Sequence, residues 1–302
     1  MRLRRIAVAI IAAPLSLGAQ PTVPATTRYA AVAAALERLI EHERADKRLP
    51  AVSIALVDGH DIVWARGFGY QNPKDSTPAT AETVYRVGSV SKLFTDIGIM
   101  QLVERGTIDL DAPVSRVLGA RFAPRNAFVD SITLRQMMSH RAGLVREPPA
   151  GNYFDPRGSS LGDMVASLNR TALVYPPTTH TKYSNAAIGV VGYVLEASQH
   201  APFATYLQRS VLQPLGLRSS AFEPLPSLTP RLASAFMWTV DGHGTEDGVP
   251  FPAPTFQLGM SPAGSMYATV TDLARFMSVL FDGGAPVLKR ETLEKMWIPQ
   301  YA

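Results

Sequence analysis

Cysteine is absent from the 302-residue sequence, and this absence limits the chemistry open to the chain. Without a thiol there can be no disulfide, no cysteine nucleophile and no cysteine-ligated metal. Histidine is also scarce, and its spacing matches neither H-E-x-x-H nor another metal-binding pattern. The six residues are His42, His60, His140, His180, His200 and His243. We therefore expect neither a metal nor another cofactor.

A large excess of charge of one sign is missing as well. The formal net charge is +4, but Arg2, Arg4 and Arg5 lie in a segment that we expect to be removed. Without them the balance is close to zero, so the composition gives no reason to expect a nucleic-acid partner or an adsorbing membrane surface. The apolar fraction of 46% is large enough for a sizeable core. We find no internal repeat and no low-complexity tract.

Residues 1–19 have the pattern of a secretory signal peptide. A basic start is followed by an apolar run from Ile6 to Leu17 and by the small residues Gly18 and Ala19. The run is short for a membrane span, so cleavage after Ala19 is favoured over an uncleaved anchor. No later run is long enough to cross a bilayer. We expect an exported protein, periplasmic or secreted, in which residues 20–28 form a loose leader.

Periodicity and turn residues predict an alternation of helices and strands. Helical spacing begins at Tyr29 and is ended by Pro50, and strands 51–57 and 62–69 flank an Asp58-Gly59 turn. Further helices are predicted at Ser89, Ile132, Ile188, Phe203, after the cap Thr269, and at Arg290. Two stretches rich in proline and glycine, 146–160 and 223–255, are predicted to be long loops, the second of them a lid or substrate-side loop.

The stretch 87–95, VGSVSKLFT, carries the strongest chemical pattern. Ser89 and Lys92 stand three residues apart where a helix is predicted to begin, so they share a face. A serine hydroxyl is a weak nucleophile until a base or cation activates it. The chain has six lysines, and only Lys92 has a serine three residues before it. S-x-x-K marks serine β-lactamases and penicillin-binding proteins, and the alternative is a surface lysine beside a capping serine.

A second serine pattern, Gly158-Ser-Ser-Leu-Gly162, matches the G-x-S-x-G elbow of α/β-hydrolases. That motif needs a buried strand before it and a helix after it. Residues 153–157 do not have the pattern of such a strand. We therefore interpret Ser160 as part of a loop and not as a nucleophile.

Several stretches together resemble one family, the serine β-lactamase-related hydrolases of the class C type. This group includes class C β-lactamases, D-alanyl-D-alanine carboxypeptidases and family VIII esterases. The matching pieces occur in the family's order over roughly residues 30–300. They are PAVSIALVDG (50–59), YRVGSVSKLFT (85–95), DLDAPVSRVL (109–118), ITLRQMMSHRAGL (132–144), YSN (183–185), PLGL (214–217) and AGSMYATVTDLARF (263–276).

The resemblance implies an α/β fold of the serine β-lactamase and penicillin-binding-protein type. An antiparallel sheet flanked by helices is expected beside a helical region. Residues 29–302 would form the catalytic domain, with an α/β part of about 29–85 and 256–302 and a helical part of about 86–255. The substrate would be a small molecule or a peptidoglycan peptide, and the oligomeric state is left open.

The resemblance also implies roles for four residues. Ser89 would be the acylated nucleophile and Lys92 its proton partner. Tyr183 would relay protons, because a phenol near cations can lose its proton below its usual pKa. Asn185 would hold a substrate amide, and as the residue before a predicted helix it is also a candidate cap. We expect His140 to be structural and to hold a turn near this site.

One element of the family pattern is not found. A third motif, K-T-G or H-x-G, is expected on a strand after Leu273, and His243-Gly244-Thr245 lies too early to be it. We therefore expect the C-terminal strands to be missing because the chain is a fragment, has lost a segment or is completed by another chain. The predicted function is hydrolysis of β-lactams, D-Ala peptides or small esters through an acyl-enzyme at Ser89. The alternative is a catalytically impaired pseudoenzyme that binds penicillin or peptidoglycan.

Overall fold

The computed structural model describes residues 22–125, 128–155, 157–240 and 246–301. The predicted signal peptide and the His243-Gly244-Thr245 tripeptide lie outside these ranges. Val23, in the segment predicted to be a loose leader, exchanges two backbone hydrogen bonds of 3.0 Å with Ala65. The leader is therefore attached to the rest of the fold at this residue.

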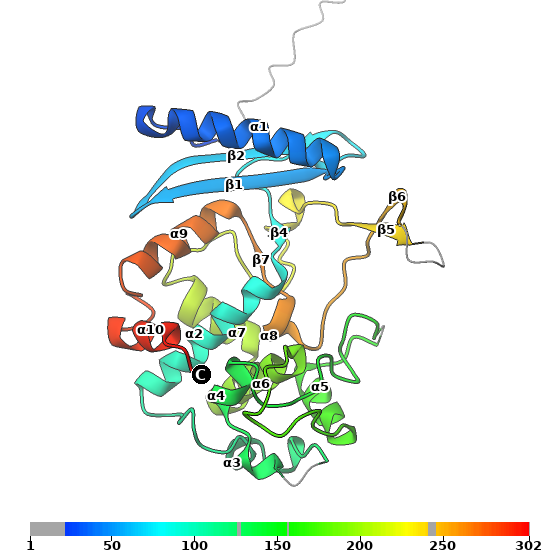
Figure 1. Ribbon diagram of the computed structural model, residues 1–302, viewed down its shortest axis with the longest axis vertical. Coiled ribbons are helices and arrows are strands. Elements are labelled where there is room, and N and C mark those ends of the chain that lie inside the picture. The colour runs from blue at the N-terminus through cyan, green and yellow to red at the C-terminus, as the bar shows by residue number, and fades with distance from the viewer. Residues whose placement is uncertain (1–21, 126–127, 156, 241–245, 302) are drawn as a thin grey trace, which may run out of the picture.

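A β-hairpin with helices on both faces forms one end of the molecule. Strands β1 (Ala51–Asp58) and β2 (Asp61–Asn72) pair antiparallel, and β3 (Thr77–Pro78) adds to β2. Helix α1 (Ala30–Asp46) covers one face, and α9 (Val270–Phe281) lies against the other (Figure 1). Among the described strands β1 is at the edge of this sheet.

Strand alternation explains how the hairpin holds α1. Trp64 and Phe68 are four residues apart, so they point to the same face of β2. They form a buried cluster with Ala33 of α1, and apolar positions of the helix and of β1 pack against it: Leu36, Ile40, Ile54 and Leu56. The helix was predicted from its helical spacing and the two strands from the segments on either side of the Asp58-Gly59 turn, and the structure contains all three.

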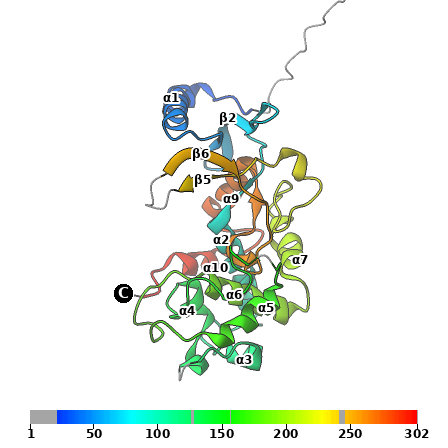
Figure 2. The same ribbon diagram turned by 90° about the vertical axis from the view of Figure 1, so that its right-hand side faces the viewer.

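Helix α6 (Asn185–Gln199) is the centre of the helical region. Every residue from Asn185 to Leu195 is buried, as expected of a helix that is apolar on all sides. Helix α2 (Ser91–Glu104) packs against it, together with α4 (Leu134–Met138), α5 (Leu161–Ser167), α7 (Phe203–Leu207) and the short α8 (Ser261–Gly264). Helix α3 (Ser115–Leu118) also contacts α6, and α10 (Arg290–Trp297) is the last helix of the described residues. Viewed from the side, the sheet and the helical region lie at opposite ends of the long axis (Figure 2).

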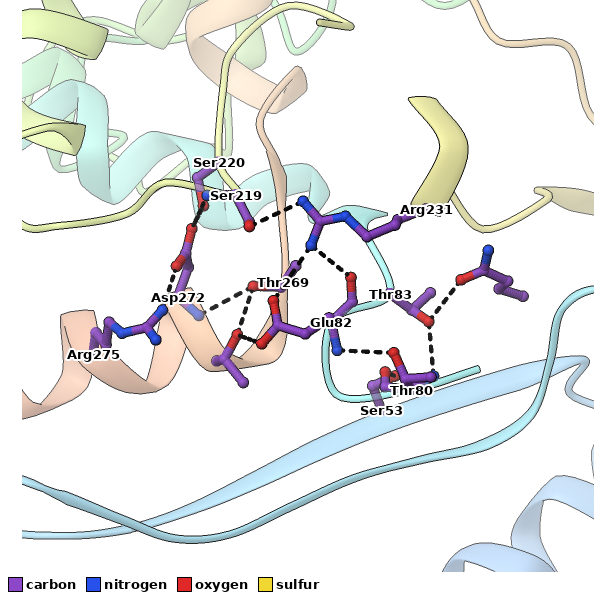
Figure 3. A network of polar contacts seen from close by, with 12 residues as sticks. Ser53, Thr80, Glu82, Thr83, Ser219, Ser220, Arg231, Thr269, Asp272 and Arg275 are labelled. Atoms are coloured by element: carbon purple, nitrogen blue, oxygen red, sulfur yellow. Dashed lines mark hydrogen bonds and ion pairs between the residues drawn. The ribbon is translucent and has the colours of Figure 1, made fainter. Parts of the chain in front are cut away.

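A polar network joins the two ends of the molecule (Figure 3). Asp272, in the first turn of α9, accepts hydrogen bonds from the Ser219 backbone and the Ser220 hydroxyl, at 2.7 and 2.8 Å. Glu82 accepts from Thr271 at 2.6 Å and pairs with Arg231 at 3.3 Å. Loops that are far apart in sequence are thereby fixed to the start of α9, which the Thr269 side chain caps as predicted.

The long loop predicted over 223–255 is in part a β-hairpin. Strands β5 (Phe236–Val240) and β6 (Glu246–Pro252) pair antiparallel and stand apart from the helices in Figure 1. Proline is tolerated at edges and strand ends, and both strands of an isolated hairpin have a free edge. The proline-rich composition therefore concealed these strands. The loop 146–160 is irregular as predicted, although Pro148, Ala150 and Gly151 are buried.

An antiparallel sheet with flanking helices beside a helical region is the predicted α/β class, and this prediction is confirmed. No helix among the described residues is long and apolar enough to cross a membrane.

Candidate active site

Ser89 lies in a single 3-10 turn, Gly88–Val90, that runs directly into α2. Gly88 has φ +54°, a conformation that residues with a side chain rarely adopt, and this turns the chain from β4 (Tyr85–Arg86) into the helix. Strand β4 is fixed in turn by pairing with β7 (Tyr267–Ala268). The result is an exposed serine at the start of a buried helix, where backbone N–H groups have no partner within the helix.

Ser89, Lys92 and Tyr183 form one hydrogen-bonded group. The Lys92 ammonium donates to Ser89 Oγ at 3.0 Å, and Ser89 Oγ lies 2.7 Å from the Tyr183 hydroxyl. Lys92 Nζ is also 4.8 Å from the centre of the Tyr183 ring. Lys92 is only 8% exposed, whereas Ser89 is open to solvent. A sheltered cation thus lies beside an accessible hydroxyl.

The backbone of α8 holds Lys92 from the other side. Lys92 Nζ donates to the carbonyl oxygen of Ala263 at 2.6 Å, and Thr95, one turn further along α2, donates to Pro262 at 2.8 Å. The Met266 N–H donates to the Ser91 hydroxyl at 3.0 Å. The family resemblance of the sequence includes residues 263–276 but gave them no role in the site. A backbone carbonyl cannot be recognised from the type of side chain in the sequence.

The surroundings of Tyr183 favour its ionised form. Partial burial raises the pKa of Tyr183, but hydrogen bonds from Lys92 and Ser89 and the charges of Lys92 and Arg146 outweigh it, so the pKa is lowered. The His140 ring packs on Tyr183 with centroids 4.5 Å apart. Burial and the charge of Lys92 lower the pKa of His140, which favours a neutral ring.

His140 also fixes the turn that it was predicted to hold. Its backbone is left-handed, with φ +58°, and its carbonyl accepts from the Lys182 N–H at 2.9 Å. Its Nδ1 accepts from the Ser184 N–H at 3.3 Å. The residues on both sides of Tyr183 are therefore tied to His140, which places the phenol next to Ser89.

Asn185 lies beside this group and does not cap α6. Ser184 is the cap, because its hydroxyl accepts from the Ala187 N–H at 2.9 Å and its backbone is extended. Asn185 is instead the first helical residue, and its Nδ2 donates to Glu147 Oε1 at 2.7 Å. The sequence did not single out Glu147, which stands in a proline-rich loop that reads as surface.

Ser160 has a structural role and is not part of the Ser89 group. It caps α5 in a reciprocal box with Asp163, each side chain bonding the other's backbone N–H. A helix follows it, but among the described residues before it there is no adjoining strand, as expected for a chance match to G-x-S-x-G. Among the described residues, no group of three side chains could hold a metal ion.

A cavity of about 470 Å³ includes Gly88, the residue before Ser89, in its lining. Gly88 lines it together with Tyr153, Phe256 and Arg86, and residues of the 232–236 and 253–256 segments complete its wall. Arg86 donates to the carbonyl oxygens of Phe256 and Gly264 at 3.0 and 3.3 Å. Its volume lies in the range of small-molecule pockets.

A larger hollow of about 930 Å³ lies between α2, α4 and α10. Asp96, one turn after Lys92, lines it and has a buried Oδ1 without a hydrogen-bond partner. Burial raises the pKa of Asp96 well above its usual range, against the opposing effect of the Lys92 charge. Burial therefore favours the neutral form of Asp96, one helical turn after Lys92.

Known proteins of similar sequence are β-lactamase-like. "Beta-lactamase-like protein 2" of Dictyostelium discoideum is 28% identical over 274 residues, which are 87% of this chain and 48% of that protein. "Putative beta-lactamase-like 1" of Homo sapiens is 29% identical over 271 residues, 86% of this chain and 52% of that protein. The chain therefore spans about half the length of these relatives.

Solved structures share the fold. The octameric penicillin-binding protein homologue from Pyrococcus abyssi has a TM-score of 0.75 at 26% identity, with 87% of this chain and 59% of that chain covered. EstCE1, a hydrolase with promiscuous acyltransferase activity, has a TM-score of 0.74 at 23% identity, with 89% and 77% covered. The Beta-lactamase family model matches residues 36–301. The chain belongs to the Beta-lactamase family, the one to which its sequence motifs point.

Proposed function

We propose that this chain is a serine hydrolase that forms an acyl-enzyme on Ser89. The observation that carries the proposal is the contiguous hydrogen-bonded group of Ser89, Lys92 and Tyr183, with 3.0 and 2.7 Å between partners. A nucleophile within hydrogen-bonding reach of its base, with the base itself oriented by a third group, is the arrangement that nucleophilic catalysis requires.

In the first half-reaction Ser89 Oγ attacks the acyl carbonyl carbon. The Tyr183 phenolate takes the serine proton, and the Lys92 ammonium stabilises both oxygens while the charge moves. Proton transfer by a positioned base contributes about 10²–10⁴ in rate. The backbone N–H of Ser89, in the turn that leads into α2, would donate to the developing oxyanion, and the N-terminus of α2 favours the negative charge of that oxyanion.

Collapse of the tetrahedral intermediate breaks the bond to the leaving group. The Tyr183 hydroxyl, now protonated, gives its proton to the departing oxygen or nitrogen and becomes a phenolate again. In the second half-reaction the phenolate takes a proton from water, and the hydroxide formed attacks the acyl carbonyl. Expulsion of Ser89 Oγ, which recovers its proton from Tyr183, completes hydrolysis.

The proposed acyl donors are β-lactams, D-Ala peptides or small esters. Hydrolases with related folds support this range: EstCE1 is described as a hydrolase with acyltransferase activity, and a D-amino acid amidase from Ochrobactrum anthropi superposes with a TM-score of 0.72 at 23% identity. The cavity beside Gly88 provides room for groups of this size.

Hydrolysis of p-nitrophenyl esters tests the proposal. Ser89→Ala should abolish turnover, and Ser160→Ala should leave it unchanged, although both remove one serine hydroxyl. A reversal of the two effects would contradict the proposal. Penicillin binding at Ser89 with no turnover would identify the alternative, a pseudoenzyme.

We also propose that the protein is exported with cleavage after Ala19. Amino-terminal sequencing of the protein recovered from the periplasm or medium should begin at Gln20. Recovery of the intact Met1 end from the membrane fraction would point to an uncleaved anchor.

A further inference from the structure

The hollow of about 930 Å³ between α2, α4 and α10 has no part in the proposed reaction. The 106–111 loop and the segment 295–300 complete its walls. None of the residues that line it also lines the cavity that includes Gly88. Its volume lies in the range of pockets that hold small molecules. The hollow is therefore a second candidate site, separate from the first.

The wall on α2 begins one turn after the catalytic lysine candidate. Asp96, Met100 and Val103 line the hollow at intervals of four and three residues, so they share one face of the helix. Lys92 precedes Asp96 by four residues on the same face, and the Ala263 carbonyl holds its ammonium at 2.6 Å. The hollow thus follows the face of α2 that carries the lysine, further along the helix.

Much of the lining is apolar. Thioether and aliphatic side chains from each of the surrounding segments contribute: Met100, Val103, Ile108, Leu110, Met138 and Met296. These side chains belong to the main hydrophobic core or pack against it, so the hollow lies at the edge of the core. Methionine side chains adapt to ligands of different shape. A ligand that fills this space therefore needs an apolar body.

The charged side chains of the hollow other than Asp96 balance one another. Arg135 donates to both oxygens of the Asp111 carboxylate, at 2.7 and 2.8 Å. Asp109 and Lys295 add one charge of each sign. These four groups therefore have no excess of either sign that would select an ionic ligand.

Asp96 is the polar group of the hollow that needs a partner. Its Oδ1 is buried and has no hydrogen-bond partner among the described residues, although buried acceptors in folded proteins are nearly always paired. Burial raises the pKa of Asp96 against the opposing charge of Lys92, which favours the neutral carboxyl. A neutral carboxyl has both an O–H donor and an acceptor oxygen. Because the terminal torsion of an aspartate is soft, a small rotation presents either oxygen to the hollow.

We propose that this hollow binds an uncharged amphiphile with a primary carboxamide head group, which pairs with the Asp96 carboxyl while its hydrocarbon part lies against the apolar side chains. The amide N–H donates to the unpaired oxygen, and the carboxyl O–H donates to the amide oxygen. An ammonium is a poorer match, because Asp96 would have to ionise and the cost of burying two charges can exceed their attraction. The inference does not depend on acyl transfer at Ser89.

Two probes that differ in one group test the head-group pairing. Octanamide and 2-nonanone share the alkyl chain and the carbonyl, and the ketone has a methyl group in place of the NH₂. A hollow that selected by hydrophobicity alone would prefer the ketone. Calorimetric titration of Ser89→Ala, in which no turnover is expected, should show octanamide binding at least several-fold more tightly, the scale of one hydrogen bond to an otherwise unpaired acceptor. Equal affinity, or a preference for the ketone, would overturn the proposal.

Two further substitutions, each combined with Ser89→Ala, separate the neutral pairing from an ionic one. Asn has an amide oxygen and N–H donors, so Asp96→Asn should keep the preference for octanamide. Asp96→Leu has a similar shape without polar atoms and should abolish the preference. Because this change removes an unpaired buried group, the fold should be retained, which circular dichroism and urea denaturation check. Octylamine that binds more tightly than octanamide, and is lost in Asp96→Asn, would show a cation site and overturn the proposal.

Photolabelling locates the probe without any substitution in the hollow. An alkyl carboxamide with a diazirine in its chain should label peptides that contain residues 100–111 or 295–300 after irradiation. An excess of octanamide should suppress this labelling. Labelling confined to peptides that line the cavity with Gly88, such as one containing 253–256, would overturn the assignment of the amide to the hollow. Labelling that octanamide does not suppress would also contradict a specific site.

Discussion

Serine has two different roles in this chain: Ser89 is the proposed nucleophile, and Ser160 caps α5. Its hydroxyl accepts from the Asp163 N–H at 3.1 Å and so caps α5. Loss of such a cap costs about 1 kcal/mol. Ser160→Ala should therefore lower the free energy of unfolding by about that amount in urea denaturation. Ser160→Asp, which restores a capping oxygen, is the matched control and should recover most of the loss; a full loss in both variants would show that the cap is not the cause.

The pH dependence of acylation should report on Tyr183. The unfolded reference pKa is 10.0, and the folded value lies below it. Since the deprotonated phenol is the active base, the rate should rise with pH through the lowered pKa and reach its plateau at a lower pH than an unperturbed phenol would give. Tyr183→Phe should remove this rising limb and most of the rate. A rising limb that persists unchanged in Tyr183→Phe would assign it to another group.

The sequence indicated the side chains of the site but not the contacts that place them. Ser89 and Lys92 were predicted from a three-residue spacing, which one helical turn converts into contact. Tyr183 came only from the family motif, because 94 residues separate it from Ser89 and no local pattern spans that gap. Glu147 and the Ala263 carbonyl were missed, the first because its loop reads as surface and the second because it belongs to the backbone.

At the scale of elements, the contact between α6 and α8 links the core to the site. A Cβ added at Gly192 would lie 2.1 Å from the ring of Pro262, next to the residue whose carbonyl holds Lys92. Gly192→Ala should displace α8, destabilise the fold by about 1–3 kcal/mol and slow acylation. Urea denaturation and stopped-flow acylation measure the two effects.

Gly189, one turn earlier in α6, provides the matched control. A Cβ there would meet the end of the Met164 side chain at 2.3 Å, and a methionine can rearrange easily. Gly189→Ala should therefore have a much smaller effect on stability and none on acylation. Equal effects of the two variants would show that the approach of α8 is not what positions Lys92.

The start of α9 carries a second element-scale prediction. Asp272 is fully buried and is the acceptor for Ser219 and Ser220. Asp272→Ala leaves these donors unpaired and should cost about 3 kcal/mol. Arg275→Ala removes only a half-exposed ion-pair partner and should cost about 0–1 kcal/mol. Comparable losses in the two variants, measured by thermal or urea unfolding, would contradict this assignment.

Elements with strong local patterns were predictable, and those made by long-range pairing were not. The Asp58-Gly59 turn between β1 and β2 and the helical spacing of α1 and α9 are local, and these elements were found as predicted. Strands β4 and β7 are two residues each and join segments about 180 positions apart, so no window of sequence shows them. The hairpin β5–β6 was hidden by its prolines and glycines.

At the scale of the whole molecule, the site exists only because distant segments converge on α2. Residues 87–92 provide the nucleophile and the cation, 183–185 the phenol and the amide, and 262–266 the backbone that holds the lysine. The polar network of Figure 3 fixes the sheet end to the start of α9, and β7 connects α9 to α8. The sequence predicted that an α/β part and a helical part meet at Ser89. The Beta-lactamase family model matches residues 36–301, a range that contains all three of these segments.

Mass spectrometry of the acyl-enzyme tests the central claim most directly. The protein is incubated with a penicillin or an activated ester, quenched in acid and digested. The account predicts one acyl group per chain, located on the peptide that contains Ser89, absent from Ser89→Ala and retained in Ser160→Ala. An acyl group on any other residue, or labelling that survives Ser89→Ala, would contradict it.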